Sequence, residues 1–201
     1  MTVEALGLLE MDSIAAGVET ADAMAKMAPV EFVDTFMVSP GKFVVIVHGD
    51  PSSVRSSLDA GEAVAAGAVV DRLYIPFLDA QVLPAIRNTV VLEETPGALG
   101  FVETLSVASG VQAADDAAKA AEVVVGHLYL GRGIGGKSVL MVAGLLHDVQ
   151  AAVGAASDRA RGNARLVATR IIPQPDPELW ARLRTGLRRA PAGRAGDLGS
   201  A

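Results

Sequence analysis

Cysteine is absent from all 201 residues of the sequence. Its absence excludes disulfide bonds, thiolate catalysis and metal clusters held by cysteine. Aromatic residues amount to only 4% of the chain, so the core has to be built from Ala, Val, Leu and Ile. The three histidines, His48, His127 and His147, have no partners at metal-ligand spacing, and we expect them at the surface or at strand ends. The sequence therefore predicts neither a metal site nor a cofactor.

Long apolar runs are missing as well. The longest one, from Ser138 to Leu146, is too short to cross a bilayer, and the amino terminus lacks the basic and apolar regions of a secretory signal. The formal net charge is −6; the last twenty residues contribute +4, which leaves −10 for the rest of the chain. An acidic body argues against nucleic-acid binding. We expect a cytoplasmic protein without membrane or nucleic-acid partners.

Lysine is also rare, and its placement reveals an internal repeat. Residues 5–30 and 98–123 are identical at 14 of 26 positions when they are aligned at an offset of 93. The four lysines of the chain form two equivalent pairs within the two copies: Lys26 with Lys119, and Lys42 with Lys137. A repeat of this length indicates a duplicated domain, and each copy has two positions at which a compact ammonium group is needed.

The repeat sets the expected domain boundaries. We expect a first domain over 1–92, a second over 93–188, and a disordered tail over 189–201, where Gly, Pro and Ala predominate. Each domain has enough apolar residues for a core of its own.

Within each copy the order of the elements is predicted to be β-α-β-β-α-β. The first helix is capped by Asp12 or Ser13 and carries an apolar stripe at spacings of three and four, formed by Ile14, Val18, Ala21, Met24 and Ala25. A proline at 51 after Asp50 starts the second helix, and a terminal helix is expected from Pro177 to Arg188. This order favours an α+β fold of two ferredoxin-like domains, each an antiparallel sheet with helices on one face. Predicted strands include 3–10, 32–38, 43–47, 69–75, 122–130, 138–142 and 164–172.

Residues 131–138, GRGIGGKS, match the phosphate-binding pattern G-x-x-x-x-G-K-[ST]. Such a loop must open a helix whose amino end faces the phosphates, whereas Ser138 opens a predicted strand. The equivalent loop around Gly41 keeps only Gly-Lys. We therefore do not expect nucleotide hydrolysis, and we read the glycines as room for a close approach or for backbone amides that face a ligand.

Two carboxylates and one tryptophan complete the candidate residues. Glu10 and Glu103 end the first strand of each copy, either as paired acids or, as we favour, as carboxylates that cap or bridge. Trp180 is expected to anchor the terminal helix. The arginines within 182–189 are interpreted as a solvated helix face in preference to a binding surface for an acidic partner.

These motifs resemble the shell proteins of bacterial microcompartments, in the tandem form that carries two BMC domains in one chain. The resemblance covers about residues 4–185. It rests on the Ala-Leu-Gly strand with its Glu, on the Ala-Asp-Ala-Met-x-Lys helix, on the Gly-Lys hairpins and on the Ile-Pro that closes each domain. The loops look most like those of the trimeric shell protein of propanediol-utilising compartments.

The resemblance implies a structural, non-enzymatic subunit. Such a subunit forms a homotrimer shaped as a pseudohexagonal tile, which joins other shell proteins, hexamers and pentamers, at its edges. A central pore would admit a small polar metabolite, and its lining would be Ser39, Pro40, Gly41, Gly133, Ile134 and Gly135. The iron–sulfur cluster of the propanediol type is not expected, because Ser39 stands where that type has cysteine.

Edge residues follow from the same resemblance. The edge lysine of the family falls on Lys26 and Lys119, and the positions of the second edge residue, an arginine in the family, are occupied here by Phe77 and Gln174. The alternative function is a ferredoxin-like regulatory module that binds a small ligand between its domains. A measurement of mass separates the two, since a ligand-sensing monomer or dimer has no need of trimers.

Overall fold

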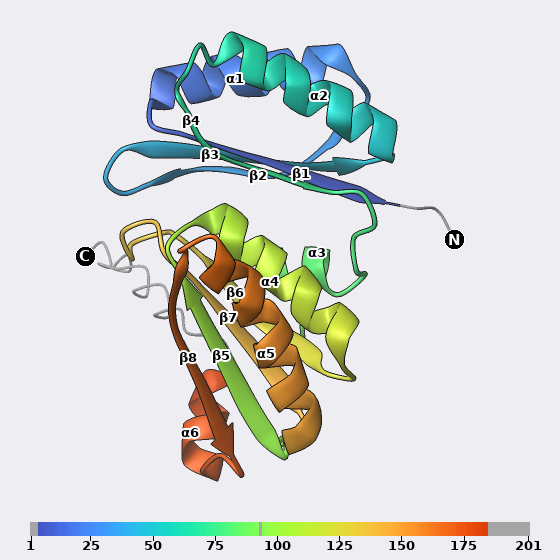
Figure 1. Ribbon diagram of the computed structural model, residues 1–201, viewed down its shortest axis with the longest axis vertical. Coiled ribbons are helices and arrows are strands. Elements are labelled where there is room, and N and C mark those ends of the chain that lie inside the picture. Colours follow the sequence, from blue (N-terminus) through green and yellow to red (C-terminus); the bar gives the residue numbers. More distant parts are fainter. Residues whose placement is uncertain (1–3, 93, 185–201) are drawn as a thin grey trace, which may run out of the picture.

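A computed structural model describes residues 4–92 and 94–184, and each copy of the repeat forms a four-stranded antiparallel sheet with two long helices (Figure 1). The expected disordered tail, 189–201, lies outside the described residues. The first copy contains β1 (Ala5–Met11), α1 (Ile14–Met27), β2 (Glu31–Val38), β3 (Lys42–Gly49), α2 (Pro51–Val64), β4 (Val69–Ile75) and α3 (Val82–Ile86). The second copy contains β5 (Ala98–Thr104), α4 (Val107–Ala120), β6 (Val124–Leu130), β7 (Ser138–Gly144), α5 (Leu146–Gly162), β8 (Leu166–Pro173) and α6 (Pro177–Leu183).

The two sheets have the same topology, which confirms the predicted α+β fold. Their strand orders are β2-β3-β1-β4 and β6-β7-β5-β8. The register is also repeated, because Leu8 pairs with Ile46 in the first sheet and Phe101 pairs with Met141 at the equivalent place in the second. A residue of one copy therefore has a defined structural counterpart in the other.

Helix starts follow the predicted caps. The hydroxyl of Ser13 accepts a hydrogen bond from the Ala16 amide, and Ser106 does the same for Ser109 at the start of α4. At the start of α2, hydrogen bonds from Ser53 and Ser52 lower the pKa of Asp50 to about 2. The first helix of both copies is thus fixed by the same serine cap.

The largest core is shared between the copies, although the repeat predicts a separate core for each. On one face of the first sheet, Leu9 and Met11 pack with Met24 of α1 and with Leu58 of α2. The other face belongs to a single apolar cluster that combines Leu6, Leu8, Val44 and Ile46 with Val107 and Val111 of α4. Figure 1 shows α4 lying between the two sheets.

The predicted apolar stripe of α1 is wrong as a description of its buried face. The structure buries Gly17, Thr20 and Met24, while Ile14 and Val18 are 40% and 56% exposed. Ala25 is exposed too. The main contacts of α1 are with its own copy, α2, β3 and β1, so the helix is covered on one side. A stripe of apolar residues at helical spacing predicts an apolar face, but it does not predict whether the same chain covers that face.

One histidine also departs from the prediction. His127 is buried in the middle of strand β6 rather than at the surface or at a strand end, and Asn88 and Arg184 lie beside its ring. Its Nδ1 is 3.3 Å from the side-chain oxygen of Asn88, and its Nε2 is 3.1 Å from the carbonyl oxygen of Arg184. Trp180 is buried against Leu99 and Met141, which confirms its predicted role as the anchor of α6.

Candidate functional site

The two hairpin loops predicted to line a pore lie against each other within the chain. Gly131 and Gly136 are buried beside the first hairpin. A Cβ atom on Gly131 would be 2.9 Å from the side chain of Val38, and one on Gly136 would be 3.4 Å from the carbonyl oxygen of Ser39. Close approach of the two loops therefore requires glycine at these positions.

The predicted pore residues sit at the outer part of the two loops. Ser39, Pro40 and Gly41 are exposed between β2 and β3, and Gly133 and Gly135 are exposed between β6 and β7. Ile134 is half-buried. The structure thus groups all six residues, from two segments almost a hundred residues apart, in one pair of neighbouring loops.

The phosphate-binding pattern does not form a phosphate-binding structure. Ser138 opens strand β7 and not a helix, as the sequence predicts. Lys137 donates to the Glu103 carboxylate at 3.0 Å, so its ammonium is engaged by the fold. Gly136, Lys137 and Ser138 therefore do not open a helix, as the phosphate-binding pattern requires.

Arg132, which the sequence analysis did not single out, ties the second loop to the first copy. Its guanidinium donates to Asp34 at 2.5 Å and lies 4.2 Å from the centre of the Phe36 ring. Both partners belong to β2, whereas Arg132 follows β6. This ion pair with an added cation–π contact holds the two hairpins in a fixed relation. In the sequence, the position of this basic residue inside a glycine-rich loop could have marked Arg132 as a candidate.

Glu10 joins the first sheet to α4, and it bridges as the sequence analysis favoured. Its carboxylate is fully buried, accepts a hydrogen bond from the Ala108 amide at 2.8 Å and lies 3.6 Å from the Lys42 ammonium. Burial raises the pKa of Glu10, and the Ala108 hydrogen bond and Lys42 oppose that rise. The free amides at the amino end of a helix attract a carboxylate.

Glu103 occupies the equivalent position in the second sheet with a different environment. Its side chain is 33% exposed, and it pairs with Lys137, the counterpart of Lys42. Each copy therefore uses its second lysine on the glutamate of its own first strand. The partner from a helix amino end, which Glu10 has, is not among the contacts of Glu103 in the single chain.

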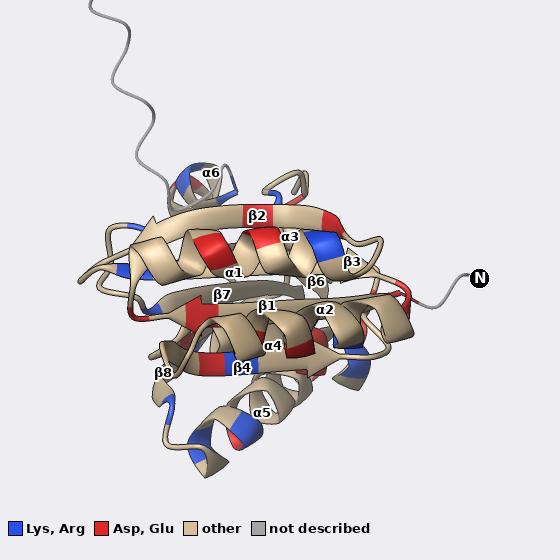
Figure 2. Cartoon of the chain, turned by 90° about the horizontal axis from the view of Figure 1, so that it is seen from above, with Lys and Arg blue, Asp and Glu red and all other residues tan. Residues whose placement is uncertain are grey.

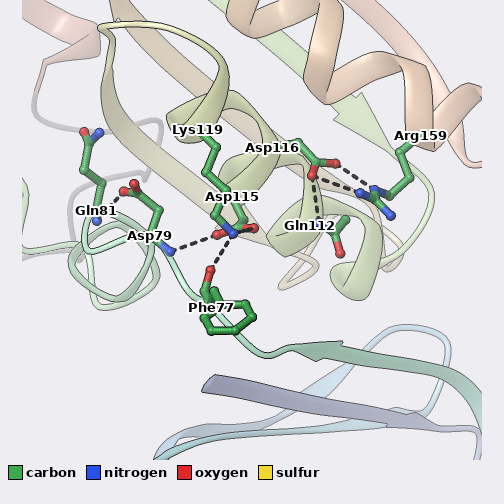
Figure 3. A network of polar contacts seen from close by, with 8 residues as sticks. All are labelled: Phe77, Asp79, Gln81, Gln112, Asp115, Asp116, Lys119 and Arg159. Carbon is green, nitrogen blue, oxygen red and sulfur yellow. Dashed lines mark hydrogen bonds and ion pairs between the residues drawn. The ribbon is translucent and has the colours of Figure 1, made fainter. Parts of the chain in front are cut away.

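A polar network joins α4 to the segment after β4 (Figure 3). Asp115 is buried and accepts a hydrogen bond from the Asp79 amide at 2.9 Å. The Lys119 ammonium donates to Asp115 and to the carbonyl oxygen of Phe77. Beside this network, Asp116 pairs with Arg159 of α5 at 2.9 Å.

Of the four residues predicted at the tile edge, the structure brings Lys119 and Phe77 together. Lys26 instead pairs with Asp22 on the exposed surface of α1. Gln174 is exposed before α6, and its backbone N–H donates a hydrogen bond to the carbonyl oxygen of Gly97. Helices α1 and α6 lie at opposite ends of the molecule in Figure 1. The spacing Asp-x-x-x-Lys, which the first helix of each copy contains, could have identified Asp22 and Asp115 as the partners of the two lysines.

Charge distribution, metal ligands and helix length give no further kind of site among the described residues. Figure 2 shows acidic and basic residues interspersed along β4 and α1. Among the described residues, no group of three or more His, Asp or Glu side chains is arranged to hold a metal ion. No helix within 4–92 or 94–184 is long and apolar enough to cross a membrane.

Comparison with known proteins gives the same two-copy division. The model of the BMC domain matches residues 5–78 and 98–175. The chain is 39% identical over 183 residues to the bacterial microcompartment shell protein PduT of Citrobacter freundii, covering 91% of this chain and 99% of that protein. It is 43% identical over 65 residues to the shell protein PduA of Salmonella typhimurium, covering 32% of this chain and 69% of that protein.

Among solved structures, a microcompartment protein from Desulfitobacterium hafniense superposes with a TM-score of 0.83. Its sequence is 40% identical, and the match covers 89% of this chain and 99% of that one. The repeat, the paired hairpins, the matched family model and these relatives agree. The chain belongs to the BMC domain family, with two BMC domains in tandem.

Proposed function

We propose that this chain is a structural subunit of a bacterial microcompartment shell, and that three copies form a pseudohexagonal tile with a central pore. The relatives that it matches over nearly their whole length carry shell-protein names. The observation that carries the proposal is the pairing of the two hairpin loops in one chain. Two BMC domains with adjacent loops supply one third of a six-domain ring, and no catalytic role is assigned to the subunit.

The proposed pore is lined alternately by the two kinds of loop. Ser39 with Pro40 and Gly41 presents a hydroxyl and a turn, and Ile134 between Gly133 and Gly135 presents an apolar side chain. Three copies of each would surround the axis. An opening of this mixed polarity suits a small polar metabolite, which loses few hydrogen bonds as it passes.

Substitution in the cysteine-free chain tests the pore. Ser39→Cys would place three thiols around one axis, and this variant should bind one Zn²⁺ ion per three chains. Ser56→Cys, at an exposed position on α2, is the matched control and should not show that ratio. Zinc binding to Ser39→Cys at one ion per chain, or none, would exclude a shared axis at this loop.

The proposed tile edges carry Lys26, Lys119, Phe77 and Gln174, where other shell proteins, hexamers and pentamers, would join. Lys26 is the cleanest position to test because its side chain is 74% exposed and pairs only locally, with Asp22. Long lysine stems cover apolar surface while the ammonium stays in contact with water or a carbonyl.

Mass measurement and electron microscopy test this assembly. We expect the purified chain to be a trimer that forms flat sheets, and Lys26→Ala to remain trimeric while it loses the sheets. Arg161→Ala is the control, since Arg161 is a similarly exposed cation that pairs with Asp158 on α5. A monomeric wild-type chain contradicts the trimer, whereas sheets that persist in Lys26→Ala contradict the edge alone.

A further inference from the structure

A cleft of about 570 Å³ lies at one end of the second sheet, and its residues belong neither to the proposed pore nor to the proposed edges. It is bounded by residues 91–92 and 94–97 before β5, by the start of β6, the end of β7 and the start of α5, and by Trp180 of α6. Its apolar wall includes Val91, Val124 and Leu145, which are 76%, 44% and 61% exposed. The volume is within the range of small-molecule sites in proteins, so the cleft has room for a small ligand with an apolar part.

The first copy has polar side chains at the equivalent place. Glu31 pairs with His48 across β2 and β3, and the counterparts of these two residues across β6 and β7 are Val124 and Ala143. The Glu31 carboxylate is 3.1 Å from Nε2 of His48 and accepts a hydrogen bond from Arg87 at 2.8 Å. These three side chains satisfy one another. Val124 and Ala143 cannot form such a cluster, and they line the cleft instead.

The start of α5 supplies hydrogen-bond donors to the cleft. In the first copy, Asp50 accepts hydrogen bonds from the amides of Ser52 and Ser53 at the start of α2. Leu145 is the counterpart of Asp50, because each follows the glycine that ends β3 or β7 in the repeated register. A leucine side chain cannot accept a hydrogen bond, so α5 has no side-chain cap. Its amino end therefore lacks the carboxylate that Asp50 supplies to α2.

Trp180 supplies a further donor. It lines the same cleft and is only 3% exposed. Its indole Nε1 is buried and has no hydrogen-bond partner among the described residues. A buried N–H group without an acceptor is destabilising, and an acceptor on a ligand would satisfy it. The cleft thus combines a helix amino end with an indole N–H, and both favour a ligand that carries a carboxylate.

Three carboxylates also line the cleft, and they restrict which acid can bind. They belong to Glu94, Glu122 and Asp148, and Asp148 pairs with His147 at 3.2 Å. A simple anion would be repelled by these like charges, whereas a simple cation would leave the helix end and the indole without an acceptor. A ligand that carries both charges matches the donors and the acceptors together. An α-amino acid with an apolar side chain has this combination.

We propose that this cleft binds an α-amino acid with an apolar side chain. The carboxylate of the ligand takes the place at the start of α5 that the Asp50 carboxylate has at the start of α2, and it accepts a hydrogen bond from the indole of Trp180. The ammonium group lies against Glu94 and Glu122, and the side chain packs on the apolar wall around Val124. The site needs one chain only, so it does not depend on the proposed tile.

Fluorescence tests the proposal directly, because Trp180 is the only tryptophan of the chain. The full chain is titrated with L-leucine, with 4-methylpentanoate, which lacks the ammonium group, and with 3-methylbutylamine, which lacks the carboxylate. L-leucine should give a saturable change in the emission of Trp180, with a dissociation constant on the order of 1 mM. The other two probes should bind at least about tenfold more weakly, since each lacks one charge-assisted contact.

Two variants test the position of the ligand. Leu145→Asp restores the cap of the first copy, so its carboxylate should compete with that of L-leucine and weaken binding at least about tenfold. Leu145 is exposed, so the fold should persist and the melting temperature should not fall. Glu122→Gln removes one charge that faces the ammonium group and should weaken binding about threefold. Glu178→Gln is the matched control, since Glu178 is an exposed carboxylate on the helix of Trp180 but does not line the cleft.

Each outcome decides one part of the proposal. Binding of L-leucine that weakens in Leu145→Asp and in Glu122→Gln, but not in Glu178→Gln, supports the site. The absence of a saturable response to L-leucine overturns it. Equal affinity for either singly charged probe overturns the proposed ligand class, and undiminished binding to Leu145→Asp overturns the proposed position. None of these results depends on trimer formation, so a failure here leaves the proposed tile untouched.

Discussion

Helices α1 and α4 are identical at 7 of 14 positions and begin at the same serine cap, yet they are buried differently. Both place a glycine against their own sheet. On the opposite side, α4 is covered by the first sheet of the same chain, whereas the equivalent side of α1 is exposed. The difference teaches that the apolar pattern of these helices specifies a contact that the single chain makes only once.

The largest expected effect contrasts the outer faces of the two helices. Val111→Asp buries an unpaired carboxylate and should lower the free energy of unfolding by about 4 kcal/mol or more. Val18→Asp, at the equivalent but exposed position, should change the free energy of unfolding of the single chain by only about 0.5 kcal/mol. Urea unfolding of dilute chains measures both. Equal losses would mean that α1 is covered within the chain.

The inner faces should respond alike. A Cβ on Gly110 would lie 2.3 Å from the Cβ of Ser138, and one on Gly17 would lie 2.5 Å from the Cβ of Phe43. Gly110→Ala and Gly17→Ala should therefore each cost about 1–3 kcal/mol through overpacking, despite the better intrinsic helix propensity of alanine. Thermal melting checks this, and a stabilised variant of either kind would contradict the close approach.

Removal of Arg132 tests how the loops are held together. Arg132→Ala loses the ion pair with Asp34 and the contact with Phe36, at a cost of about 1 kcal/mol. Amide hydrogen exchange should accelerate in both hairpin loops. Arg55→Ala is the control, because Arg55 lies over Tyr74 within the first copy and should leave the loops unchanged. Unaltered exchange in Arg132→Ala would show that the glycine contacts suffice.

The smallest expected effect is a dependence of the folding stability on pH, caused by Glu10. Burial raises the pKa of Glu10 above 4.5, so the folded chain keeps a proton that the unfolded chain has already lost. The wild type should therefore lose stability, relative to Glu10→Gln, as the pH rises from below 4.5 through the raised pKa. Melting of the wild type and of Glu10→Gln at fixed protein concentration across this range measures both slopes.

The sequence predicted the repeat, the order of strands and helices, a helix cap at Asp12 or Ser13 and the anchoring Trp180, because each depends on local pattern or on comparison of the two copies. It did not predict which side of α1 is buried, since helical spacing marks an apolar face whether or not the same chain covers that face. The burial of His127 and the partner of Arg132 depend on segments distant in sequence, and no single-residue pattern marks them.

The shared core of the first sheet and α4 affects how well the proposed ring withstands dilution. Every chain that folds brings two of six domains together at the effective concentration of a covalent linker. Half of the six contacts around the ring then form without any encounter between molecules. Ring formation consequently scales with the third power of chain concentration in place of the sixth, so that closed tiles would persist at dilutions at which six separate domains drift apart.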